Sequence, residues 1–248
     1  AALVVLSGCT FPFGQGNDGD GAPVDNVDVS DAYFGLAWYR SGTTLNPVMD
    51  GTEVNSMLRE ALYEGLFEIK NDFTLENELC EDYTSDGTAF SFTIKKGIKF
   101  WSGAELTASD VAESLKTVLE NESSPYHNRL TEVSSIEAVT KRMVRITLAS
   151  PNVNFPKLLD IPIYRAGTTD EGEFAEGTGP YKPVQNGAAW TLEANENWHG
   201  GFLGTIRHIT LVKMTRADAP AMYPSCAAPV LRRTTRISHS PARSIPFR

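Results

Sequence analysis

The chain has 248 residues, with 22 basic and 31 acidic side chains and a formal net charge of −9. This acidic balance argues against nucleic acid as a partner. No apolar run reaches the roughly 18 residues that a membrane-spanning helix needs. The three cysteines suggest no convincing pairing, so we do not expect a disulfide framework.

The first 31 residues predict two segments that precede the folded part. Ala1–Cys9 reads AALVVLSGC, an apolar run whose end resembles a lipobox, the processing site of bacterial lipoproteins. In this interpretation 1–9 is a signal-peptide remnant, and Cys9 becomes the lipidated N-terminus, anchored stably by two acyl chains. The alternative is a buried cysteine at the start of a strand. Residues 10–31 are rich in Gly and Asp without positive charge and predict a flexible acidic linker.

A first strand is expected to begin near Ala32, in the segment YFGLAWY. The sequence EVNSMLREALYEGL then predicts an amphipathic helix that Gly65 closes. Its buried stripe consists of Val54, Met57, Leu58, Ala61 and Leu62.

Residues 85–122 predict a hairpin followed by a capped helix. Asp86-Gly87 forms a turn, and alternating apolar residues then make one face of a strand, which Gly97 interrupts and Ile98–Trp101 resumes. Thr107 and Asp110 form an N-cap signature. The strand residues are Phe90, Phe92 and Ile94, Leu106 precedes the cap and can pack on Val111, and the helical stripe is Val111, Leu115, Val118 and Leu119.

Two further blocks follow: GTGPY at 177–181, and NENWHGG at 195–201 after an alternating strand at Trp190, Leu192 and Ala194. Together with 44–83 and 85–122 they resemble, in the right order, the family 5 extracellular solute-binding proteins of ABC importers. The resemblance implies an α/β fold: a periplasmic-binding-protein-like (type II) first lobe, with a mixed sheet and flanking helices, spanning 32–223. Members are usually about twice as long, so the second lobe is expected to be missing.

Residues 224–248 form a basic, Pro/Ser/Arg-rich end without periodicity, and its five arginines leave 17 basic against 31 acidic side chains elsewhere. We interpret it as out-of-frame or foreign sequence; the alternative is a basic tail for nucleic acid or membrane.

The resemblance implies a substrate-binding lipoprotein of an ABC importer, extracytoplasmic and anchored to the bacterial cell membrane. It would capture oligopeptides and dock on the permease, without enzyme activity or cofactor. A nickel chelate, haem or sugar is an open alternative as ligand. Other readings are a secreted carboxylate-dependent hydrolase and a truncated product without activity. No catalytic motif or metal-ligand spacing is present, and His199 and His208 are expected to be structural.

Ligands of such receptors sit between lobes, at strand ends and loops. The first strand and its exit are therefore one candidate site, although the aromatics could instead be core residues. The GTGPY loop is a second, although its glycines could serve only a tight turn. The predicted ligand-binding residues are Trp38, Tyr39, Arg40, Ser41, Gly42, Thr43, Gly179 and Tyr181.

Overall fold

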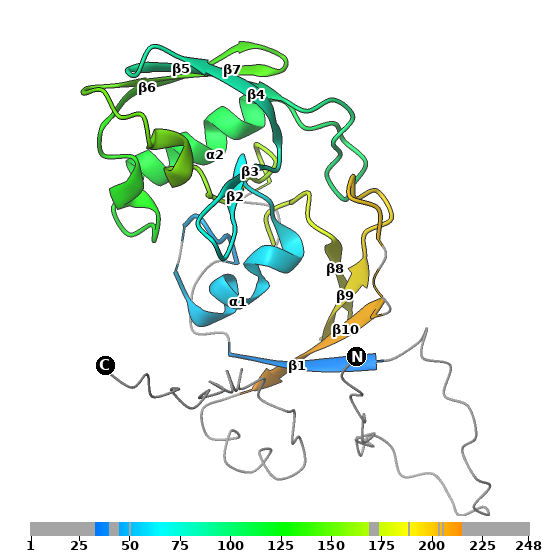
Figure 1. Ribbon diagram of the computed structural model, residues 1–248. Coiled ribbons are helices and arrows are strands. Elements are labelled where there is room, and N and C mark those ends of the chain that lie inside the picture. Colours follow the sequence, from blue (N-terminus) through cyan, green and yellow to red (C-terminus); the bar gives the residue numbers. More distant parts are fainter. Residues whose placement is uncertain are drawn as a thin grey trace, which may run out of the picture. The chain divides into compact units, whose positions relative to one another are not determined.

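The structure is a computed structural model that describes residues 33–39, 45–49, 51–168, 174–187, 189–202, 204 and 206–214 (Figure 1). The predicted segments 1–9, 10–31 and 224–248 lie outside these residues. The helices within them are α1 (Glu53–Leu62) and α2 (Ala108–Glu120), with the 3₁₀ turns η2 (His127–Arg129) and η3 (Phe155–Leu158). The strands are β1 (Tyr33–Tyr39), β2 (Phe67–Ile69), β3 (Leu75–Asn77), β4 (Cys80–Ser85), β5 (Ala89–Ile94), β6 (Val133–Thr140), β7 (Met143–Leu148), β8 (Tyr181–Asn186), β9 (Ala189–Ala194) and β10 (His208–Met214).

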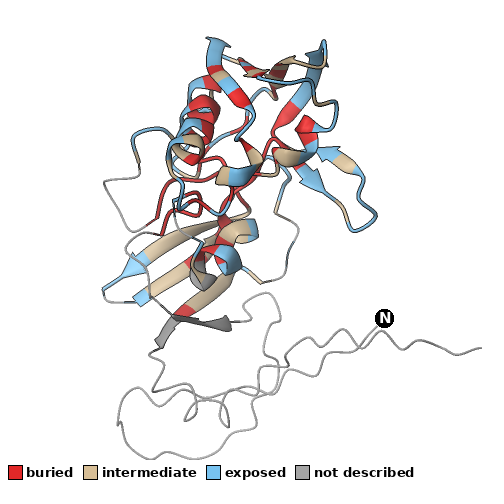
Figure 2. Ribbon diagram, turned by 90° about the vertical axis from the view of Figure 1, so that its left-hand side faces the viewer, coloured by how far each residue is buried: buried red, intermediate tan, exposed pale blue. Residues whose placement is uncertain are grey.

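One sheet is antiparallel, with strand order β4-β5-β7-β6, and α2 packs against β6 and β7. The expected alternation on β5 is confirmed: Phe90, Phe92 and Ile94 are buried, while the residues between them are half-buried. The predicted turn before β5 is present, because Gly87 has a φ of 95° and Asp86 Oδ1 accepts the Ala89 amide at 2.7 Å. Buried residues fill the interior between α2 and this sheet (Figure 2).

The predicted N-cap of α2 is confirmed. Asp110 Oδ2 accepts the backbone N–H of Thr107 at 2.8 Å, which completes the reciprocal cap. Asp110 is also buried, and its Oδ1 accepts the amide of Ala166 at 3.0 Å, so the cap ties the helix to a distant loop. The apolar stripe is buried as expected, with only its last member, Leu119, partly exposed.

The prediction of a strand at Ile98–Trp101 is wrong. This segment makes only an isolated bridge between Lys99 and Glu105. The turn at Gly103, whose φ is 92°, folds the chain back so that Leu106 N donates to Ile98 O at 2.9 Å. The segment therefore pairs with its own continuation and not with the sheet.

The second sheet has strand order β1-β10-β9-β8, in which β1 runs parallel to β10 and the other pairs are antiparallel. The first strand begins at Tyr33, close to the expected start. On β9 the alternation is confirmed, since Leu192 is fully buried and Trp190 packs edge-on against Phe174 with ring centroids 4.9 Å apart.

Two details of α1 differ from the expectation. Leu58 and Leu62 are buried, but Met57 is 38% exposed, and the buried face includes Asn55 in its place. The helix ends at Leu62, and extended backbone follows, so Gly65 does not close it. Gly65 lies instead where a Cβ would come within 3.1 Å of Phe67 O and 3.2 Å of Ile161 N. None of the described helices is long and apolar enough to cross a membrane.

Candidate functional site

The GTGPY loop rests on the C-terminal end of α1. Gly179 N donates to Leu62 O at 3.0 Å, and a Cβ on Gly179 would lie 2.5 Å from the Leu62 carbonyl carbon. A Cβ on Gly177 would overlap the Leu62 carbonyl oxygen. Both glycines are therefore needed for the close approach of two backbone segments.

The same loop is fixed from its other side. Asn195, which is buried, donates from Nδ2 to Gly179 O at 2.8 Å and from its backbone N to Pro180 O at 2.7 Å. The Tyr181 hydroxyl donates to Ile206 O at 2.7 Å, and its ring packs edge-on against Phe202. Gly179 and Tyr181 are thus held rigidly, and ligand binding by them stays a prediction.

The described part of the structure does not show the other predicted ligand-binding residues meeting at one site. Trp38 and Tyr39 lie at the end of β1, opposite Lys213 and Met214 of β10, and their side chains are not described. The remaining predicted positions, which are Arg40, Ser41, Gly42, Thr43 and the lipidation residue Cys9, lie outside the described residues.

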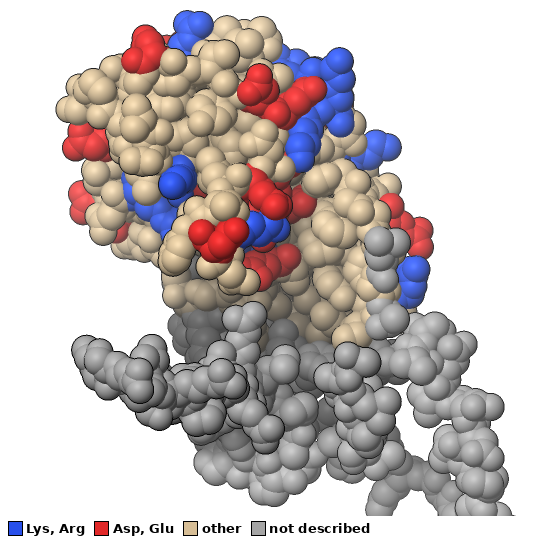
Figure 3. All heavy atoms as spheres, viewed as in Figure 1, with Lys and Arg blue, Asp and Glu red and all other residues tan. Residues whose placement is uncertain are grey.

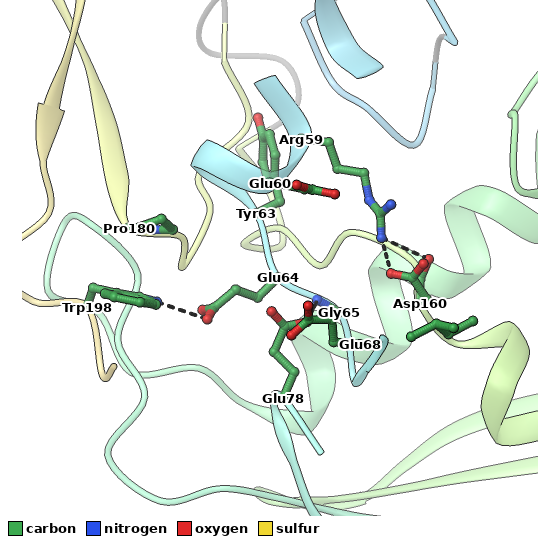
Figure 4. A pocket seen from close by; sticks show the side chains of 11 residues that line it. Arg59, Glu60, Tyr63, Glu64, Gly65, Glu68, Glu78, Asp160, Pro180 and Trp198 are labelled. Carbon is green, nitrogen blue, oxygen red and sulfur yellow. Dashed lines mark hydrogen bonds and ion pairs between the residues drawn. The ribbon is translucent and has the colours of Figure 1, made fainter. Parts of the chain in front are cut away.

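Beside Pro180 the structure shows a pocket of about 290 Å³ that sequence reasoning missed (Figure 4). It lies at the end of α1, between β2 and the turn that carries Trp198. Five carboxylates line it and only one arginine. Its lining residues are Arg59, Glu60, Tyr63, Glu64, Gly65, Glu68, Ile69, Glu78, Asp160, Pro180 and Trp198, and we refer to it as the acidic pocket.

Glu64 is the most deeply placed of these carboxylates, with a side chain only 4% exposed. Its backbone forms an isolated bridge with Ile163, which holds it inside the molecule. Its Oε1 accepts the indole N–H of Trp198 at 2.9 Å, and His199 Nε2 lies 2.9 Å from the same oxygen. Its Oε2 is buried and has no hydrogen-bond partner among the described residues. His199 therefore holds a buried carboxylate, in agreement with a structural role.

Glu78, which lies between β3 and β4, also lines the pocket. Its Oε2 accepts the Gly65 amide at 2.8 Å. The pKa of Glu78 is raised to about 7, mainly by burial and in smaller part by the neighbouring carboxylates of Glu64, Glu68 and Asp160, against the opposing effect of the Gly65 amide. The Glu78 carboxyl group can therefore gain or lose a proton near neutral pH.

The remaining wall is an ion pair that separates two pockets. Arg59 pairs with the Asp160 carboxylate, and the Asp160 carbonyl accepts a further bond from Arg129 at 2.9 Å. Both guanidinium groups lie against the Tyr126 ring, at 5.8 Å and 5.0 Å from its centroid. A second pocket of about 230 Å³ opens on this side, lined by Arg59 and Arg129 together with Asn55, Ser56 and Tyr126.

Charges of both signs lie on this face of the molecule. Acidic side chains alternate with basic ones over α1 and the β2–β3 hairpin in Figure 3. No group of three or more His, Cys, Asp or Glu side chains within the described ranges is placed to hold a metal ion. The sequence signal for this pocket was Glu64 in the YEGL segment. A carboxylate placed between apolar residues that are expected to be buried needs hydrogen-bond or ion-pair partners.

Comparison with known proteins decides the family. The family described as bacterial extracellular solute-binding proteins, family 5 Middle, matches residues 74–222. The chain belongs to this family. The resemblance seen in the sequence is therefore confirmed.

Named relatives include the glutathione-binding protein GsiB of Salmonella choleraesuis, which is 30% identical over 156 residues that cover 56% of this chain and 30% of that protein. GsiB of Escherichia coli is 30% identical over 155 residues, with the same coverage. The matched part of the chain thus spans only 30% of the length of these relatives.

Solved structures confirm the fold class. NikA from Brucella suis, in complex with Fe(III)-EDTA, superposes with a TM-score of 0.65 at 23% identity, covering 79% of this chain and 42% of NikA. The oligopeptide-binding protein AppA from Bacillus subtilis, in complex with a nonapeptide, gives a TM-score of 0.63 at 22% identity, with coverages of 78% and 42%. At these identities the likeness concerns the fold alone. The relatives are binding proteins, and the hydrolase alternative gains no support from them.

Proposed function

We propose that this chain belongs to the receptor of an ABC importer that captures an oligopeptide or another small solute outside the cytoplasm. The observation that carries the proposal is the family match over residues 74–222, on a fold shared with a solved oligopeptide-binding protein. The names and titles of the similar proteins mention glutathione, a nickel complex and a peptide. The choice of an oligopeptide as the solute of this chain is therefore part of the proposal.

The proposed mechanism is capture without chemistry on the solute. A binding protein of this kind closes around its ligand by hinge motion, and the closed form docks on the permease, while another subunit hydrolyses ATP. We place the ligand-binding backbone at the exit of β1, at Trp38–Thr43, and at Gly179 and Tyr181. The rigid seating of Gly179 on α1 and of Tyr181 on Ile206 supports this placement, because a preorganised wall loses little entropy on binding.

We further propose that Cys9 is lipidated and anchors the receptor to the membrane. The support is the segment AALVVLSGC, in which an apolar run ends in Leu-Ser-Gly-Cys. Two acyl chains on one cysteine provide stable anchoring, whereas one chain does not. Metabolic labelling with a fatty-acid analogue in the bacterial cell, followed by membrane fractionation, should show label and membrane retention that Cys9→Ser abolishes. Retention of the Cys9→Ser protein in the membrane without any label on the wild type would overturn this assignment.

The import function is tested in the cell that carries the gene. Deletion of the gene should abolish uptake of a labelled tripeptide mixture, and a plasmid copy should restore it. Uptake of labelled glucose serves as the matched control and should be unchanged. If the deletion leaves tripeptide uptake intact and instead abolishes uptake of nickel, haem or a sugar, the importer assignment stands and the oligopeptide assignment falls. If no solute is affected, the receptor function itself is wrong.

A further inference from the structure

We propose that the acidic pocket is a binding site for an organic cation, which it holds by an alkyl-ammonium group between Glu64 and Glu78. This inference concerns the pocket alone and does not depend on the import function. The ammonium group could belong to a free small amine or to the amino terminus of a peptide, and the experiment below separates these two sources.

The first argument is charge. The lining carries Glu60, Glu64, Glu68, Glu78 and Asp160 against the single cation Arg59. Arg59 is already paired with Asp160, and Glu68 pairs at 2.6 Å with Lys70 outside the lining. Within the described part of the chain, Glu60 and Glu78 have no ion-pair partner, and Glu64 has only His199. A cation entering the pocket therefore meets uncompensated negative charge in a partly desolvated site, where attraction is stronger than in water.

The second argument is the unpartnered oxygen of Glu64. Polar groups buried to this extent almost always have a hydrogen-bond partner. Glu64 Oε1 has two hydrogen-bond partners, Trp198 and His199. Oε2 has no hydrogen-bond partner among the described residues. Oε2 is sealed from water in this structure. Glu64 lines the pocket, so a donor bound there would supply the hydrogen bond that Oε2 lacks.

The third argument is the chemistry of the donor. An ammonium group has three N–H donors and no acceptor, which matches a wall made of acceptors. The volume of about 290 Å³ is at the lower end for small-molecule sites and suits a short aliphatic amine. Tyr63, Pro180 and Trp198 line the pocket beside the carboxylates and provide apolar surface for the alkyl stem. A metal ion is not favoured, since no three candidate ligands within the described ranges converge.

The fourth argument is the state of Glu78. Its pKa is raised to about 7 by burial and by the carboxylates of Glu64, Glu68 and Asp160, while the Gly65 amide opposes the rise. A bound ammonium group would favour the ionised carboxylate and expel the proton that Glu78 carries near neutral pH. Binding should therefore be coupled to proton release.

Calorimetric titration of the whole chain with n-butylamine tests the site, with 1-butanol as the uncharged probe of the same length. We expect saturable heat with the amine and none with the alcohol. Glu64→Gln keeps an acceptor for Trp198 and removes the charge, and Glu78→Gln does the same for Gly65. Each should weaken binding at least about tenfold, because hydrogen bonds to charged groups are lost. Glu113→Gln on the exposed face of α2 should bind like the wild type.

Wild-type binding measured at pH 7 in two buffers of different ionisation enthalpy provides a readout that does not depend on whether a variant folds. The apparent enthalpies should differ in the sense of proton release. The sources are separated by trialanine and N-acetyl-trialanine: binding of the first alone identifies a peptide amino terminus as an accepted donor, and binding of n-butylamine alone identifies a free amine. No heat with either amine, or equal affinity in wild type, Glu64→Gln and Glu78→Gln, would overturn the proposal.

Discussion

Trp198 donates its indole N–H to Glu64 at 2.9 Å, and the two residues are 134 positions apart in the chain. This bond joins the YEGL segment at the end of α1 to the NENWHGG turn after β9. Both segments are recognisable in the sequence, but neither of them indicates that the two are in contact. The bond therefore fixes the relative position of α1 and the second sheet, and it forms one wall of the acidic pocket.

Trp198→Phe should destabilise the fold. The substitution keeps an aromatic ring but removes one of the two neighbours of Glu64 Oε1, so a buried carboxylate loses part of its compensation. We expect a loss of about 1–3 kcal/mol in the free energy of unfolding, measured by urea denaturation at pH 7. Phe73→Leu, at a side chain that is 80% exposed, is the control and should change it by less than about 0.5 kcal/mol. Equal stability of wild type and Trp198→Phe would show that the bond contributes nothing.

Gly179→Ala should be more harmful than an alanine at an ordinary loop glycine. The added Cβ would lie 2.5 Å from the Leu62 carbonyl carbon, so the loop or the end of α1 must move. Overpacking of this kind costs about 1–3 kcal/mol, and the denaturation midpoint should fall accordingly. Gly51→Ala is the matched control, because its nearest neighbour would be Pro125 Cβ at 3.3 Å in an exposed loop. A midpoint for Gly179→Ala equal to that of Gly51→Ala would refute the argument.

Glu78 should make stability depend on pH. Its folded-state pKa of about 7 lies above the ordinary value of 4.5, so between these values the native state holds a proton that the unfolded state has lost. The slope of unfolding free energy against pH is then negative: the contribution is complete below pH 4.5 and is lost as the pH rises through 7. Its size is about 2 kcal/mol, because partial hydration reduces the effect of the full shift.

Glu78→Gln isolates this contribution. The free energy of unfolding of the variant, measured relative to the wild type, should rise between pH 5 and pH 8 by about 2 kcal/mol. Glu113→Gln should show no such trend, since its side chain lies on the exposed face of α2. A difference between Glu78→Gln and the wild type that stays constant across this interval would mean that Glu78 is ionised throughout.

Cys80 should be inert while the protein is folded. The residue is fully buried on the first strand of the antiparallel sheet, and burial raises the pKa of its thiol to about 12. Because the thiolate is the reactive form, labelling by a disulfide reagent at pH 8 should be slow. A Cys9→Ser/Cys226→Ser variant leaves this thiol alone for measurement, and guanidinium chloride should restore rapid labelling. Fast reaction without denaturant would place Cys80 at the surface.

Local rules were sufficient where a structure depends on neighbours in the sequence. The alternation of Phe90, Phe92 and Ile94 predicts a half-buried strand, and the pair Thr107 and Asp110 predicts the start of α2, because strand faces and helix caps form between residues a few positions apart. The order of four such blocks also indicated the family correctly. The capping prediction did not include the bond from Ala166 to Asp110, which spans 56 residues.

Tertiary contacts decided the rest. Met57 was expected to be buried with Leu58, yet the fold turns α1 so that the polar Asn55 lies inside, and helical spacing alone cannot choose between adjacent stripes. Gly65 does not close α1, because the helix already ends at Leu62. Gly65 lies instead against Ile161, which is distant in the sequence. The acidic pocket depends on Glu64, Glu78, Asp160 and Trp198 meeting from four segments. Local sequence patterns do not predict which distant segments will be in contact. Long-range packing, and not local conformational preference, brings these four segments together.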